Sequence, residues 1–213
     1  IRHSFKLPAL LGWRSQHAFV DLPTQEPVTK TGQLDQLSYL MLTSGTTGQA
    51  KVIRGSLRPL AALLDWYPRS FDVNEQDRFT LFSGLAHDPL LRDIFVPLSL
   101  GACIYIPDPD LLRKPGPLRQ WMIDNSVSVS HMTPALAQLI SLDSEKSPPC
   151  SSLRRLIFSG DKLLSHKLEA MRHFAPTARV INCYGCTETP QIHSWQVISS
   201  DSQGLLPVGQ GTQ

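Results

Sequence analysis

Hydrophobic and polar positions along this chain alternate with two periods. Short apolar runs rich in β-branched residues predict strands at residues 37–43, 78–83, 102–106, 127–132, 155–159 and 179–183. Longer stretches with an apolar stripe at helical spacing predict helices at residues 57–66, 89–98, 116–125, 134–142 and 164–174. Strands that alternate with helices of this length are typical of βαβ units. The sequence therefore predicts an α/β fold with parallel sheets flanked by helices.

Composition narrows the classes of partner. The chain has 213 residues, is 41% hydrophobic and 18% charged, and can bury a core. Its net charge of +2 gives no electrostatic basis for binding nucleic acid or an anionic membrane. No stretch reaches the roughly 20 apolar residues that a membrane helix requires. We therefore expect neither nucleic acid nor membrane as a partner.

The four cysteines are compatible with two interpretations. Cys183 and Cys186 have the CxxC spacing of a redox pair or of half a zinc site. A second CxxC or a histidine pair is missing from the sequence, so reduced thiols in a cytoplasmic protein are the expectation.

Residues 43–51 form the most informative segment, Thr-Ser-Gly-Thr-Thr-Gly-Gln-Ala-Lys. Small hydroxyl residues and glycines let backbone N–H groups approach an anion, and Lys51 supplies a countercharge. A Walker A loop would need adjacent Gly and Lys, whereas here Gly48 and Lys51 are separated. The segment predicts a phosphate-binding loop, and a turn without a ligand is the alternative.

Polar residues follow two of the predicted strands. Ser159-Gly160-Asp161 follows the strand at 155–159, and residues 184–188 follow the strand at 179–183. The carboxyl ends of parallel strands are where such sheets bind ligands. Tyr184 offers a face for a base, Thr187 a hydroxyl for phosphate and Glu188 an oxygen ligand for Mg²⁺. Together with residues 43–51, these groups suit a nucleoside triphosphate.

The two motifs together resemble those of the adenylate-forming superfamily. That family includes acyl-CoA synthetases, luciferases and the adenylation domains of nonribosomal peptide synthetases. Residues 84–89 stand where its acyl-pocket motif belongs, and residues 206–209 look like its next landmark. Residues 84–95 are most similar to amino-acid adenylation domains of the α-aminoadipate reductase type. The likeness covers residues 37–211.

The resemblance implies ATP-dependent activation of an amino-acid carboxylate as an aminoacyl-adenylate, with release of pyrophosphate. The acyl group would then pass to the phosphopantetheine thiol of a carrier protein domain. ATP and Mg²⁺ are the implied cofactors, and the remainder of a larger multidomain synthetase is the implied partner. Charge that moves onto pyrophosphate must be met by preorganised donors and a cation.

The resemblance also implies roles for single residues. The β- and γ-phosphates would lie on Lys51 and the loop residues Thr43, Ser44, Gly45, Thr46, Thr47 and Gly48. Thr187 would contact the α-phosphate and Glu188 would bind Mg²⁺. Adenine would stack on Tyr184, its edge contacted by Asn182, Ser159, Gly160 and Asp161. His87 would act as a gate beside the reacting carboxylate, or is a loop histidine without a role.

In the acyl pocket, Asp88 matches the family aspartate that pairs with a substrate α-ammonium, which favours an amino acid over a fatty acid. The other expected lining residues are Pro89, Arg92, His131, Ile157, Ser159, Cys183, Gln191 and Ile192. Arg92 and His131 would make the pocket cationic, suited to a side-chain acceptor or carboxylate. The alternatives are an Arg92 that pairs with Asp93 and a His131 that belongs to the core.

The chain departs from the family pattern at Ala50 and Val52, which flank Lys51, and at Cys186. A ribose-binding aspartate and a lysine on a mobile C-terminal domain are expected beyond Gln213. Residues 1–213 are therefore interpreted as a single piece of an adenylation domain, the central part of its large N-terminal domain, with the mobile C-terminal domain absent. The alternatives are an acyl-CoA synthetase-like enzyme for a plain carboxylic acid and a non-catalytic scaffold.

Overall fold

The structure is a computed structural model that describes residues 33–44, 50–142 and 147–212. Its strands are β1 Leu37–Ser44, β2 Ala50–Ser56, β3 Arg78–Thr80, β4 Cys103–Tyr105, β5 Val129–Met132, β6 Arg155–Phe158, β7 Arg179–Cys186, β8 Thr189–Val197 and β9 Gln210–Gly211. Its helices are α1 Arg58–Phe71, α2 Pro89–Leu100, α3 Pro115–Asp124, α4 Pro134–Ser141 and α5 Ser165–Phe174, with a 3₁₀ helix η1 at Pro109–Arg113. None of these helices is long and apolar enough to cross a membrane.

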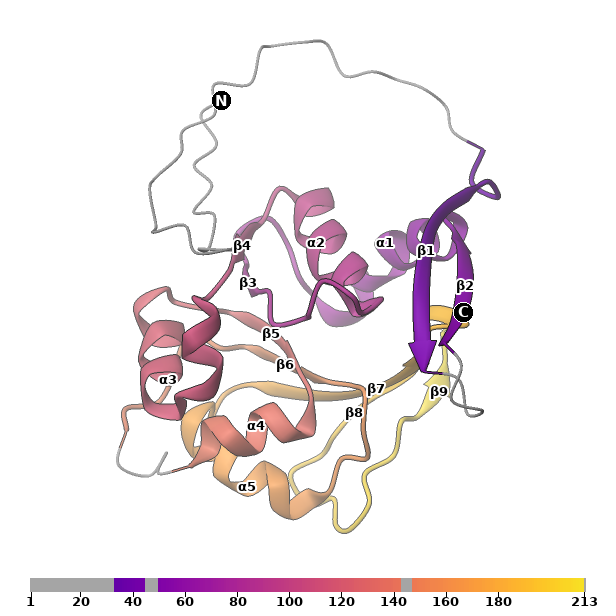
Figure 1. The fold of residues 1–213 in the computed structure, drawn as a ribbon. Helices are drawn as coiled ribbons and strands as arrows, with labels where there is room; N and C mark the ends of the chain where they lie inside the picture. Colours follow the sequence, from indigo (N-terminus) through magenta and orange to yellow (C-terminus); the bar gives the residue numbers. More distant parts are fainter. Residues whose placement is uncertain (1–32, 45–49, 143–146, 213) are drawn as a thin grey trace, which may run out of the picture.

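Seven strands form one sheet between two layers of helices (Figure 1). The strand order is β4-β3-β5-β6-β7-β8-β9, parallel from β4 to β7 and antiparallel at β8 and β9. Side chains of β6 alternate between two cores: Leu156 and Phe158 pack with α3, α4 and α5, whereas Ile157 packs with α1 and α2. This burial on both faces explains why β6 is a continuous apolar run. The predicted α/β architecture is confirmed.

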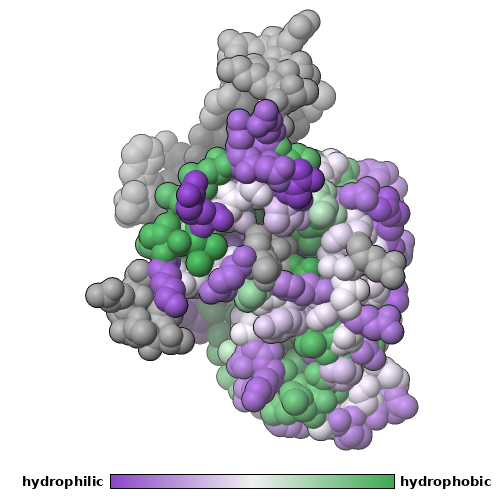
Figure 2. All heavy atoms as spheres, turned by 90° about the vertical axis from the view of Figure 1, so that its right-hand side faces the viewer, coloured by the Kyte–Doolittle hydropathy of each residue, from purple (hydrophilic) through white to green (hydrophobic). Residues whose placement is uncertain are grey.

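The strand that precedes the predicted phosphate loop belongs to a separate sheet. β1 confirms the predicted strand at 37–43, but it pairs with β2 in an antiparallel hairpin and does not join the parallel sheet. Leu40, Leu42 and Val52 are exposed on this hairpin. Figure 2 views the molecule from the side on which the hairpin lies in Figure 1. Thr43 lies opposite Lys51 in the hairpin register, so the strands bring the two ends of the loop segment together.

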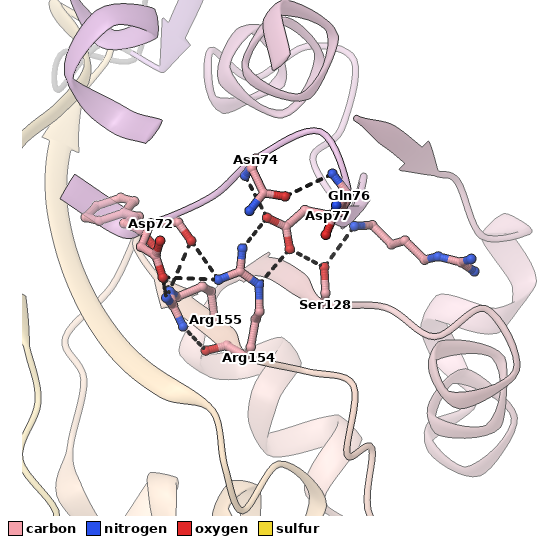
Figure 3. A network of polar contacts seen from close by, with 9 residues as sticks. Asp72, Asn74, Gln76, Asp77, Ser128, Arg154 and Arg155 are labelled. Carbon is pink, nitrogen blue, oxygen red and sulfur yellow. Dashed lines mark hydrogen bonds and ion pairs between the residues drawn. The ribbon is translucent and has the colours of Figure 1, made fainter. Parts of the chain in front are cut away.

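A polar cluster ties the amino ends of β3, β5 and β6 together, at the edge of the sheet away from the strands' carboxyl ends (Figure 3). Asp77 is 2% exposed. It accepts hydrogen bonds from Arg154 Nε (2.8 Å), Ser128 Oγ (2.6 Å) and the backbone N–H of Asn74 (2.9 Å). Burial raises the pKa of Asp77, but these hydrogen bonds outweigh burial and hold the pKa below its usual value.

We expect Asp77→Asn to destabilise the fold by about 2 kcal/mol, because it removes the charge opposite Arg154. The cost is kept low since Arg154 is partly exposed and can be rehydrated. The depressed pKa means that this stabilisation is present above the unfolded-state pKa of about 4 and is lost as pH falls through the lower folded-state value. Urea unfolding at pH 7 and pH 3 measures both effects. An equal difference between parent and variant at the two pH values would contradict the account.

Candidate functional site

A cavity of about 680 Å³ opens at the carboxyl ends of the parallel strands. Segments that follow β3, β5 and β6, together with the end of β7, contribute to its lining. The predicted site residues that line it are His87, Asp88, Pro89, Arg92, His131, Ser159, Gly160, Tyr184, Thr187 and Ile192. The sheet therefore brings most of the predicted nucleotide and acyl residues to one place, as expected for the carboxyl edge of such a sheet.

Asp88 and Thr187 meet across this cavity. Thr187 Oγ1 donates a hydrogen bond to Asp88 Oδ1 over 2.8 Å. Asp88 is the N-cap residue of α2, yet its side chain makes no capping bond, because its backbone is already helical. Thr187 lies in the tight turn between β7 and β8, where Cys186 pairs with Thr189. The bond thus connects the start of a helix to the tip of a β-hairpin.

The glycine that follows Ser159 suits the turn after β6. Gly160 has φ of +90°, a conformation that side chains with a Cβ rarely adopt. This turn places Ser159 and Gly160 in the cavity lining, whereas Asp161 is exposed and lies outside the lining.

A buried polar network lies behind the cavity lining, and the sequence indicates only part of it, the pair of Arg92 and Asp93. Asp93 accepts hydrogen bonds from Arg92 Nε (2.9 Å) and Ser83 Oγ (2.5 Å). Nδ1 of His131 lies 3.1 Å from Oδ1 of Asp93, and its Nε2 lies 2.6 Å from the hydroxyl of Tyr67. The side chains of Arg92, His131 and Asp93 are at most 4% exposed. Arg92 and His131 are part of the cavity lining, whereas Tyr67 and Asp93 lie behind it.

The protonation states of this network follow from its burial. Burial and the neighbouring positive charge of Arg92 lower the pKa of His131 to about 4. Burial raises the pKa of Asp93, but Arg92 and His131 outweigh it and hold that pKa well below its usual range. His131 is therefore neutral at pH 7, and the charge of Arg92 is balanced by Asp93. The structure shows the alternative in which Arg92 pairs with Asp93, so the pocket is less cationic than the predicted one.

His131 gives a testable pH dependence. Its folded-state pKa of about 4 lies below the unfolded value of about 6.5, so the unfolded chain binds the proton more readily between those two values. We expect the free energy of unfolding to fall by roughly 3 kcal/mol from this residue as pH falls from 6.5 to 4. Histidine NMR titration of the parent and of His131→Gln identifies the resonance. A midpoint near 6.5 would contradict the assignment.

Three predicted site residues are buried outside the cavity lining. Ile157 and Cys183 are 0% and 3% exposed and belong to the core between the sheet and helices α1 and α2. Ser159 and Tyr184, which lie one or two residues further along the chain, line the cavity instead. Asn182 is 1% exposed, and its amide nitrogen donates to the carbonyls of Leu206 and Pro207. These contacts tie β7 to the 206–209 segment.

The remaining predicted residues are exposed or lie outside the described part of the chain. Lys51 and Glu188 are exposed and do not belong to the lining. The predictions for Gly45, Thr46, Thr47 and Gly48, and for the side chains of Ser44 and Gln191, fall outside the described residues. Thr43 is half-buried on β1.

Gly84, Gly185 and Cys186 also line the cavity and belong to predicted motifs, without a predicted role of their own. The lining residues outside any predicted motif are Phe82, Ser83, Leu112, Met132, Thr133 and Leu136. Thr133 could have been recognised as an N-cap before Pro134, since its hydroxyl accepts from the amide of Leu136. Asp93 supports the lining from behind as the partner of Arg92, which the sequence allows as an alternative. Tyr67 carries no signal in sequence, because its partner His131 is distant along the chain.

None of the four cysteines forms a disulfide bond. Burial raises the pKa of the Cys183 thiol to about 12, which disfavours the thiolate that redox chemistry or zinc binding needs. Within the described residues, no group of three or more His, Cys, Asp or Glu side chains is placed to hold a metal ion.

Comparison with known proteins identifies the family. The family model described as AMP-binding enzyme matches residues 3–211. The chain belongs to this family. The predicted likeness of this chain to amino-acid adenylation domains is also confirmed, by fungal and bacterial relatives of this AMP-binding enzyme.

L-2-aminoadipate reductase of Schizosaccharomyces pombe is 37% identical over 83% of this chain, which spans 13% of that protein. A linear gramicidin synthase polypeptide of Brevibacillus parabrevis is 28% identical over 81% of the chain, which spans 2% of it. Among solved structures, the Vibrio cholerae adenylation domain AlmE in complex with glycyl-adenosine-5'-phosphate has a TM-score of 0.78 and 28% identity, over 86% of this chain and 35% of AlmE.

Proposed function

We propose that this AMP-binding enzyme contributes the nucleotide and acyl pocket for activation of an amino acid as its aminoacyl-adenylate. The substrate carboxylate would attack the α-phosphorus of ATP, and pyrophosphate would leave. The observation that carries the proposal is the meeting of Asp88, Thr187 and Tyr184 in one cavity. A carboxylate for an ammonium, a hydroxyl for a phosphate and an aromatic face for a base are the donors and acceptors that an aminoacyl-adenylate requires.

On the nucleotide side, Tyr184 is 55% exposed within the lining and offers its ring to adenine. Asn182 is buried outside the lining, and its Oδ1 has no hydrogen-bond partner among the described residues. We propose that this oxygen accepts from the amino group at the edge of the base when the nucleotide is bound. Ser159 and Gly160 line the cavity, and Asp161 follows them in sequence, exposed and outside the lining. All three are proposed to contact the edge of the base. Lys51 and residues 43–48 are proposed to bind the β- and γ-phosphates.

Mg²⁺ is proposed to bind at Glu188. Glu188 is an exposed carboxylate in the same turn as Thr187, and a single carboxylate combined with substrate phosphates and water is a common Mg²⁺ environment. When bound, the ion would neutralise charge on the phosphates. His87, which lines the cavity next to Asp88, is proposed to stand beside the reacting carboxylate and to exclude water.

On the acyl side, Asp88 is proposed to pair with the substrate α-ammonium, while Arg92 faces the far end of the substrate. Of the guanidinium nitrogens of Arg92, only Nε has a hydrogen-bond partner among the described residues. The two terminal nitrogens can therefore donate to a side-chain carboxylate or carbonyl. Together with the likeness to L-2-aminoadipate reductase, this favours an acidic amino acid such as L-2-aminoadipate.

The wider setting of this pocket is also a proposal. We infer that residues 1–213 act as one piece of an adenylation domain within a multidomain synthetase that contains a phosphopantetheinyl carrier domain. The gramicidin synthase and aminoadipate reductase relatives, both far longer than this chain, support this view. The cytoplasmic location stays a prediction, with cysteines that form no disulfide bond as its support.

The test uses thermal unfolding in the presence of 5'-O-sulfamoyl adenosines that carry aminoadipyl, glutamyl or leucyl groups, which mimic the adenylate without turnover. A ligand that binds the folded state at a hundredfold excess over its Kd stabilises by about 2.7 kcal/mol. We expect the aminoadipyl compound to raise the Tm most and the leucyl compound least. No shift with any of the three compounds would overturn the proposal and favour a scaffold role.

A further inference from the structure

The hydrogen bond from Thr187 to Asp88 joins two residues that have separate tasks in the proposed function. The bond is 2.8 Å long and connects the β7–β8 turn to the start of α2. The two residues are 99 positions apart in sequence. Both residues line the cavity that the adenylate would occupy. A role for this bond in ligand binding rests on the proposed function and deepens it.

A threonine hydroxyl has a single proton to donate. Asp88 and a substrate phosphate are both acceptors, so the O–H of Thr187 can serve one of them at a time. If the hydroxyl turns to the α-phosphate, Asp88 loses a donor in a partly buried place, which is unfavourable unless another donor replaces it. The α-ammonium of an amino acid is such a donor, whereas a plain carboxylic acid brings none.

The surroundings of Asp88 support this exchange. Its carboxylate makes no bond to the amides of its own helix, so it is directed across the cavity. Its negative charge also extends to the hairpin that flanks the phosphate-loop segment. Burial raises the pKa of Tyr39 on β1, and the charge of Asp88 raises that pKa further. Asp88 is therefore within electrostatic reach of Tyr39 on β1 as well as in hydrogen-bond contact with Thr187.

We propose that Thr187 is a specificity-determining residue that couples recognition of the α-ammonium to binding of the α-phosphate. Before a ligand binds, the hydroxyl of Thr187 donates its hydrogen bond to Asp88. An incoming α-ammonium replaces the hydroxyl there, and the released O–H then donates to the phosphate. The pocket therefore binds an amino acid and a nucleotide cooperatively, and it selects against acids that lack the α-amino group.

The coupling is measured by calorimetric titration of the chain with L-2-aminoadipate and AMP, each alone and in the presence of the other. We expect each ligand to lower the Kd of the other by about tenfold, which corresponds to the free energy of one charge-assisted hydrogen bond. Linkage requires the two factors to be equal. Adipate, which has the same carbon chain and both carboxylates but lacks the α-amino group, is the matched ligand control. It is expected to leave the affinity for AMP unchanged.

Two variants separate the exchange from a structural role. Thr187→Val keeps the shape and removes the hydroxyl. It is expected to abolish the coupling and to tighten L-2-aminoadipate alone several-fold, because no hydroxyl competes for Asp88. Thr187→Ser keeps the hydroxyl and is expected to retain the coupling. A residue that only holds the turn would give the opposite sign, weaker amino-acid binding in Thr187→Val.

The outcomes distinguish the coupling from the proposed function. If the parent binds both ligands independently, or if Thr187→Val retains the coupling or binds L-2-aminoadipate more weakly, the exchange is overturned while the proposed function stands. If the parent binds neither L-2-aminoadipate nor any aminoacyl-sulfamoyl adenosine, the proposed function fails, and the exchange fails with it.

Discussion

Asp93→Asn is expected to destabilise this chain by about 3–5 kcal/mol, because it leaves the buried guanidinium of Arg92 without its countercharge. The side chains of Arg92 and Asp93 are 4% and 0% exposed, so water cannot take the place of the lost carboxylate. The substitution also removes the acceptor of Ser83 Oγ and the carboxylate beside His131. A loss of this size is a large part of the roughly 5–15 kcal/mol that stabilises a typical domain.

Urea unfolding measures this loss, and two further variants show its cause. Asp65→Asn breaks an exposed ion pair with Arg69 and is expected to give no measurable change. The double variant Arg92→Met/Asp93→Asn removes both charges and is expected to be more stable than Asp93→Asn alone. A loss below about 1 kcal/mol for Asp93→Asn, or a double variant less stable than the single one, would show that the ion pair does not govern this region.

The second large effect is expected at Asp88. Asp88→Ala should weaken binding of aminoadipyl-sulfamoyl adenosine by about a hundredfold or more, because the α-ammonium would enter a partly buried pocket without a counterion. Fluorescence-based or calorimetric titration gives the Kd. Asp65→Asn, at an exposed residue outside the cavity lining, serves as the control and should bind like the parent. If Asp88→Ala also binds within about threefold of the parent, Asp88 does not contact the ammonium.

Much of the fold follows from periodicity, and the exceptions have physical reasons. The predicted helix at 89–98 corresponds to α2 at Pro89–Leu100, and the strand at 155–159 to β6 at Arg155–Phe158. β2 was missed because Lys51, Arg54 and Gly55 interrupt its apolar pattern. β8 was missed because its sequence, Thr189–Val197, mixes polar and apolar residues in an antiparallel strand near the edge of the sheet.

The sequence predicts the site residues that lie in motifs at the ends of strands better than the buried residues behind the cavity lining. Ser159, Tyr184 and Thr187 follow or end strands, and the sheet carries them to the cavity. The sequence does not show where the core stops and the cavity begins, which is why Ile157 and Cys183 were assigned to the lining. The role of Asp93 as the counterion of Arg92 was considered, but its simultaneous contact with His131 depends on how α2 packs against β5.

The central claim is that this cavity binds an α-aminoacyl-adenylate and recognises its α-ammonium. Its most direct test compares the Kd of aminoadipyl-sulfamoyl adenosine with that of the adipyl compound, which differs only by the α-amino group. The account predicts that the aminoadipyl compound binds at least about a hundredfold more tightly, since only this compound supplies a cation for Asp88. Equal affinities, or failure of both compounds to bind, would contradict it.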